Sequence, residues 1–242
     1  MRRAVAIAAA YVVTASLSAQ SPAPPSDEPF TPARMRGGGA PALSPMALGG
    51  GQVFLELAVG TNGSVTNATP LRTTPPFTNL VTTAVRGWQF EPAREVVPPP
   101  AERPNDPPIR RTIPSTVLVA AVYRAPSLLT PTLGEAPKDV AQPAAETPFP
   151  AGTAVPQYPI QARAGGVVVV EVRLDRSGSI AETKVVRSAP PFDDAALNAV
   201  RQWSFRPARH ANRPAPAFAY AILGFPEPVG PATGPARGRG FN

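Results

Sequence analysis

The sequence lacks cysteine and has a single histidine, His210, among its 242 residues. Without cysteine there is no disulfide and no thiolate metal site, and one isolated histidine does not supply a zinc-binding set. A phosphate-binding loop, a calcium loop and a Gly-x-Ser-x-Gly nucleophile motif are also absent. The sequence therefore predicts no catalytic residue, no cofactor and no metal. An enzyme is the weakest of three functional hypotheses, because no cluster of titratable residues converges.

Long apolar runs are also scarce, and the clearest one opens the chain. Arg2 and Arg3 precede an apolar run over 4–13, and small and polar residues follow as far as Gln20. This order is typical of a secretory signal, whereas a membrane-spanning helix needs about 20 apolar residues. We predict that 1–20 is a cleavable signal peptide and that the mature chain is periplasmic without a stable membrane span. An uncleaved membrane anchor is the alternative.

Two parts of the chain repeat one another. Shifting the sequence by 115 positions aligns 51–94 with 166–209 without a gap, and both tryptophans, Trp88 and Trp203, coincide. The 35 prolines and 19 glycines concentrate outside these blocks, as expected for linkers between compact units. The sequence therefore predicts a signal peptide (1–20), a disordered Pro/Gly-rich arm (21–50), a first domain (51–124), a Pro/Ala-rich linker (125–154), a second domain (155–226) and a disordered basic tail (227–242).

Each copy has the hydrophobic pattern of an α+β unit. Apolar residues alternate over 53–59 and 168–174, which favours strands, and Asn62-Gly63 and Ser177-Gly178 indicate hairpin turns. Helical spacing follows over 77–88 and 192–203, and a final apolar strand is expected over 116–123 and 217–225. We predict two tandem small domains, each an antiparallel hairpin, a packed helix and a final antiparallel strand.

Aromatic residues end each predicted helix. Trp88 and Phe90 in the first copy correspond to Trp203 and Phe205 in the second. A tryptophan at the end of an amphipathic helix more often fills the core than binds a ligand. We therefore expect all four residues in the structural core.

Several charged residues also have a simple structural interpretation. Asp193 and Asp194 lie where negative charge stabilises a helix start, and His210 is expected in a solvated loop. Glu56 and Glu171 occupy equivalent strand positions, and we expect them on a solvated or cross-strand-paired face.

The second copy resembles the C-terminal domain of TonB, the energy-transducing protein of Gram-negative envelopes. The resemblance rests on Tyr158-Pro159, the hairpin around Gly178 and Trp203-x-Phe205-x-Pro207. The first copy shares the hairpin, helix and Trp-x-Phe-x-Pro pattern but has no Tyr-Pro, so it resembles a degenerate member. The TonB membrane anchor bears a histidine, whereas the single histidine here is His210, so we expect no equivalent of that anchor.

The resemblance implies a function in protein binding. Family members dock on outer-membrane transporters, and a short transporter segment adds as a strand to the last strand of the domain. By this resemblance we predict partner binding at two places. The predicted binding residues are Pro156, Gln157, Tyr158, Pro159, Ala217, Phe218, Ala219, Tyr220, Ala221, Ile222 and Leu223.

The alternative is a cell-envelope scaffold that binds peptidoglycan or holds protein copies together. The formal charge of +7 is compatible with acidic partners such as cell-wall polymer. Arg237-Gly238-Arg239-Gly240 resembles an RNA-binding tail, but an exported protein meets little RNA, so no nucleic-acid partner is expected.

Overall fold

A computed structural model describes residues 29–43, 49–126 and 135–227. The predicted signal peptide and almost all of the basic tail lie outside these residues. The described part is an α+β structure with two helices, and neither helix is long and apolar enough to cross a membrane.

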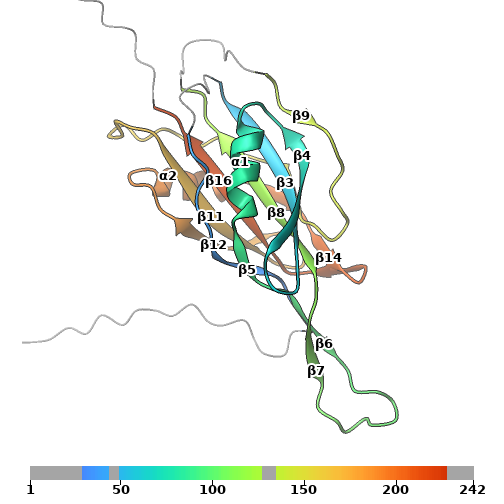
Figure 1. Cartoon of the computed structure of the whole chain (residues 1–242). Coiled ribbons are helices and arrows are strands. Elements are labelled where there is room, and N and C mark those ends of the chain that lie inside the picture. The colour runs from blue at the N-terminus through green and yellow to red at the C-terminus, as the bar shows by residue number, and fades with distance from the viewer. Residues whose placement is uncertain (1–28, 44–48, 127–134, 228–242) are drawn as a thin grey trace, which may run out of the picture.

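One seven-stranded sheet runs through both copies of the repeat (Figure 1). Its strands lie in the order β12 (Ile180–Arg187), β11 (Gly166–Leu174), β16 (Ala217–Phe225), β8 (Ser115–Tyr123), β3 (Gly51–Val59), β4 (Val65–Thr73) and β9 (Lys138–Asp139). The hairpins and closing strands therefore form where the sequence pattern predicts them. The two copies, however, are joined in one sheet and do not stand as separate domains.

The copies meet through their closing strands. β16 pairs antiparallel with β11 and parallel with β8, from Ala219 opposite Leu118 to Gly224 opposite Tyr123. Both sides of β16 are thus occupied, and the expectation that it presents a free edge is wrong. The physical reason is that β8 and β16 are apolar on both faces and become buried by pairing with each other.

The two helices lie on opposite faces of this sheet. α1 (Phe77–Arg86) packs over the side chains of Val53, Leu55 and Leu57, whereas α2 (Asp193–Val200) packs over the even-numbered residues of β11. Alternate residues of the two central strands enter different cores: Val119 and Val169 lie on the α1 side, Leu118 and Val168 on the α2 side. Each copy therefore contributes to both cores, which explains why the closing strands do not alternate between apolar and polar residues.

The segments before each copy are ordered over their described parts, contrary to the expectation of an arm over 21–50 and a linker over 125–154. They contain β1 (Phe30–Thr31), β2 (Arg34–Gly37) and β10 (Phe149–Gly152), besides β9. β2 pairs with β5 (Gln89–Glu91) and β10 with β13 (Ser204–Arg206), the strands that follow each tryptophan. Each copy therefore begins earlier than the sequence identity indicates.

The same offset of 115 relates these leading strands. Met35 pairs with Phe90, and Pro150 pairs with Phe205. Trp88 Nε1 donates to Gly39 O at 2.8 Å, and Trp203 Nε1 donates to Ala154 O at 3.1 Å. The two copies therefore match in structure over a longer span than they match in sequence.

A protruding hairpin distinguishes the first copy. β6 (Arg94–Val97) and β7 (Ile109–Thr112) extend away from the sheet in Figure 1. The second copy has the shorter β14 (Ala208–His210) and β15 (Arg213–Ala215) at this place. The proline-rich residues 98–108 of the first copy therefore form the tip of a hairpin that lies between β5 and the closing strand β8.

Candidate protein-interaction site

The predicted strand-addition residues lie inside the molecule. Ala219, Tyr220, Ala221, Ile222 and Leu223 are each at most 2% exposed. The strand that contains them has a neighbour on each side. A partner strand has no access to the backbone of β16 while β8 is paired with it.

The other predicted contact, Pro156 to Pro159, lies in a segment (155–160) at the surface beside the end of the sheet. The carbonyl of Pro156 accepts a hydrogen bond from Arg124 Nη1 at 3.1 Å, which fixes the segment to the end of β8. The Tyr158 hydroxyl donates to Ala164 O at 2.8 Å, and its ring lies edge-on to Phe192 at 5.5 Å. Burial raises the pKa of the Tyr158 hydroxyl.

Two large apolar side chains of this segment face solvent. Val155 is 56% exposed and Ile160 is 101% exposed, and Gln157 between them is also exposed. A cavity of about 450 Å³ lies beside Val155, lined by Gly50, Gly51, Gln52, Val122, Tyr123, Arg124, Ala125, Pro137, Val155, Pro156 and Gln157. Apolar side chains held rigidly next to a hollow are what a protein partner can bind.

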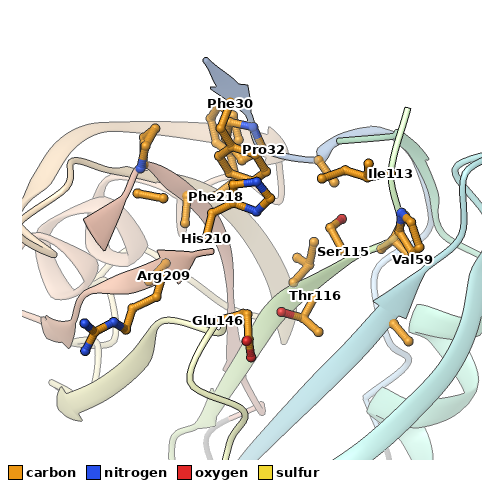
Figure 2. Close-up of a pocket in the computed structure, with 18 of the residues that line it drawn as sticks. Phe30, Pro32, Val59, Ile113, Ser115, Thr116, Glu146, Arg209, His210 and Phe218 are labelled. Atoms are coloured by element: carbon orange, nitrogen blue, oxygen red, sulfur yellow. The ribbon is translucent and has the colours of Figure 1, made fainter. Parts of the chain in front are cut away.

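A second cavity, of about 590 Å³, lies where β8 and β16 begin (Figure 2). Strand pairing starts at Leu118 and Ala219, so the residues before them separate and leave a space between the copies. The walls are mostly apolar, with Phe30 and Phe218 from different copies. This cavity belongs to the junction of the copies.

His210, expected in a solvated loop, instead packs in the wall of this second cavity. Its ring stacks on Phe30 with 4.1 Å between centroids, and its Nε2 lies 3.3 Å from Glu95 Oε2. Glu95 also pairs with Arg111, and this guanidinium lowers the pKa of the Glu95 carboxyl. The described residues contain no group of three or more potential metal ligands.

The two equivalent glutamates connect the copies. Glu171 is not solvated, and the expectation of a cross-strand pair is confirmed for it, because it lies opposite Tyr220 of β16 and accepts a hydrogen bond from it. The Glu171 carboxylate is 4% exposed and accepts from Arg34 Nη2 at 2.7 Å and from the Tyr220 hydroxyl at 3.2 Å. Glu56 accepts from the Ala144 backbone N–H at 2.9 Å. In both cases one hydrogen-bond donor, Arg34 or Ala144, belongs to the segment that precedes the other copy. The only sequence signal for this role is the recurrence of Glu in both copies.

The remaining sequence predictions concern the aromatic core and the helix start. Trp88 and Phe90 are 0% and 2% exposed, and Trp203 and Phe205 are 5% and 9% exposed. The Asp193 carboxylate accepts from the Ala189 N–H at 2.9 Å and from the Ser188 hydroxyl at 2.5 Å. It stabilises the turn before α2.

Comparison with protein families finds a match within the second copy. Residues 154–219 match the family model of the Gram-negative bacterial TonB protein C-terminal. The match begins at the exposed 155–160 segment and ends inside β16. The TonB C-terminal family is a non-enzymatic protein-interaction domain of the envelope. No curated protein matches the chain.

Proposed function

We propose that the chain is an exported, periplasmic interaction module that binds an envelope protein through 155–160 of its second copy. The partner of first choice is an outer-membrane transporter of the kind that TonB domains engage. Binding in this way relates the chain to transport across the outer membrane.

The observation that carries this proposal is the exposure of Val155 and Ile160 on either side of Pro156-Gln157-Tyr158-Pro159. The backbone here is anchored by the bonds of Pro156 and Tyr158, so the apolar side chains are presented in a fixed arrangement. Burial of β16 removes the alternative of strand addition at the closing strand.

The test is a titration of the isotope-labelled full chain with peptides that carry the short transporter segment bound by TonB domains, followed by backbone amide chemical shifts. We expect shifts over 155–160, and at least tenfold weaker binding for Val155→Glu and Ile160→Glu. Val140→Glu is the matched control, because Val140 is 56% exposed, as Val155 is, and lies outside the segment. Shifts along β16 with none at 155–160, or equal binding by all variants, would contradict the proposal.

One observation favours the scaffold alternative. The two copies hold each other through the β8–β16 pair and through Glu171 and Glu56. A scaffold that also binds peptidoglycan would sediment with purified cell wall at low salt and be released at high salt, because exposed charge contacts are screened.

A further inference from the structure

Within the described part of the chain, β12 is the long strand of the sheet that has a neighbour on one side only. The opposite edge is covered, because β9 pairs with the end of β4 and Val140 N donates to Leu71 O at 2.9 Å. Pro70, which has no N–H, further blocks that edge. The β12 edge of the sheet is therefore open to pairing with a further strand, whereas the β4 edge is covered.

The middle of β12 has a regular register. Glu182, Thr183, Lys184 and Val185 lie opposite consecutive residues of β11, and the register shifts on either side of this run. Glu182 and Lys184 consequently share one face of the sheet. Glu182 accepts from Arg173 Nε at 3.2 Å in an exposed pair, and the exposed Lys184 has no charged partner among the described residues.

We infer that β12 binds β12 of a second copy of this chain, antiparallel, about a two-fold axis at Thr183. Residues that face one another in such a pair must lie on the same face of the sheet, so the axis passes through a residue and not between two. An axis at Glu182 places the two Glu182 carboxylates together, and an axis at Lys184 places the two ammonium groups together. The axis at Thr183 instead places each Glu182 opposite Lys184 of the partner copy.

The match is confined to these charged residues. Ile180 packs against the core on the α2 side and Val186 against the core on the α1 side, so these two apolar residues do not face one another in this register. Charged residues on an edge strand normally prevent pairing. Here Glu182 and Lys184 have opposite signs, so like charges disfavour the registers centred on Glu182 and Lys184, and opposite charges favour the register centred on Thr183. Each opposite-charge cross-strand pair strengthens association by a factor of up to about five. Because the register shifts limit the regular run, we expect a reversible dimer that weakens at high salt.

The test is sedimentation velocity of the full exported chain over a range of concentrations. Glu182→Lys and Lys184→Glu should each weaken self-association about tenfold or more, since each variant places two like-charged pairs across the axis. An equimolar mixture of the two variants should associate again, because its two strands carry opposite charges at every facing position. Glu102→Lys, in the exposed loop between β6 and β7, is the control. It changes the net charge by the same amount as Glu182→Lys but lies away from β12, so this variant should associate like the unchanged chain.

Urea unfolding of each variant verifies that the fold is retained; Lys184→Glu is the decisive single variant if Glu182→Lys loses stability with its Arg173 bond. The inference is overturned if the unchanged chain stays monomeric at all concentrations, or if both reversals associate normally. It is also overturned if the mixture of folded variants fails to associate.

Discussion

Tyr123 and Phe225 occupy equivalent places at the ends of the two closing strands. Tyr123 stacks on Phe77 with 4.1 Å between centroids, and Phe225 stacks on Phe192 at 4.5 Å. The hydroxyl of Tyr123 is buried and has no hydrogen-bond partner in the described structure, and burial raises the pKa of this hydroxyl. The first copy therefore carries one polar atom that the second copy avoids.

We predict that Tyr123→Phe stabilises the protein, because it removes an unsatisfied buried hydroxyl and keeps the packing of the ring. The gain in the free energy of unfolding should be about 1 kcal/mol, measured by urea unfolding at neutral pH. The unfolded tyrosine loses its proton above about pH 10 while the folded one keeps it, so stability falls as pH rises beyond that value. Stability of the variant should fall less steeply, by about 1.4 kcal/mol per pH unit. An equal alkaline slope in both proteins would contradict this assignment.

At the scale of elements, the β8–β16 seam depends on one close approach. Gly224 faces Tyr123, and a Cβ atom at Gly224 would lie 2.2 Å from the Tyr123 ring. Only glycine lets the aromatic ring lie flat over the neighbouring strand. The pairing of the copies is therefore encoded in a large residue on one strand and a missing side chain on the other.

Gly224→Ala should destabilise the chain by about 1–3 kcal/mol, because the added methyl group overpacks the seam. Combining it with Tyr123→Ala should cost less than the sum of the two single changes, with a coupling above about 1 kcal/mol. Gly87→Ala is the control, since its nearest contact would be 3.7 Å away. Additive costs in urea unfolding would show that the two residues do not meet across the seam.

At the scale of the whole molecule, each copy completes the other. Tyr220, Ile222 and Val169 of the second copy lie in the core on the α1 side, and the Trp88 ring contacts Tyr220 with centroids 5.8 Å apart. The leading strand of the first copy supplies Arg34 to the buried Glu171. Removing one copy would expose apolar surface and leave this carboxylate unpaired.

The second copy alone, residues 139–227, should not behave as a stable monomer. We expect oligomers in size-exclusion chromatography, or urea unfolding at a much lower midpoint than the full chain, because β16 would become an exposed apolar edge. Adding the first copy as a separate chain should restore a defined complex. A monomeric second copy as stable as the full chain would show that the shared sheet contributes little.

Local pattern was sufficient to predict the hairpins, helices and closing strands of the two copies, but not the leading strands β1, β2, β9 and β10. Alternation of apolar residues located β3 and β11, continuous apolar runs located the closing strands, and helical spacing located α1 and α2. The turn glycines follow from backbone conformation, since Gly63 and Gly178 have φ of +80° and +85°, where a side chain is strained. The exposure of Val155 and Ile160 was not predictable, because it depends on what the rest of the chain covers.

The sequence by itself determined the repeat, its strands and helices, and the resemblance of the second copy to the TonB C-terminal domain. Only the tertiary structure decided that the closing strands pair with each other, that the helices lie on opposite faces, and that Glu171 is buried against Arg34. A period of two reports which face of a strand is apolar. It does not report which strand lies beside it, since either closing strand could equally have paired with another chain.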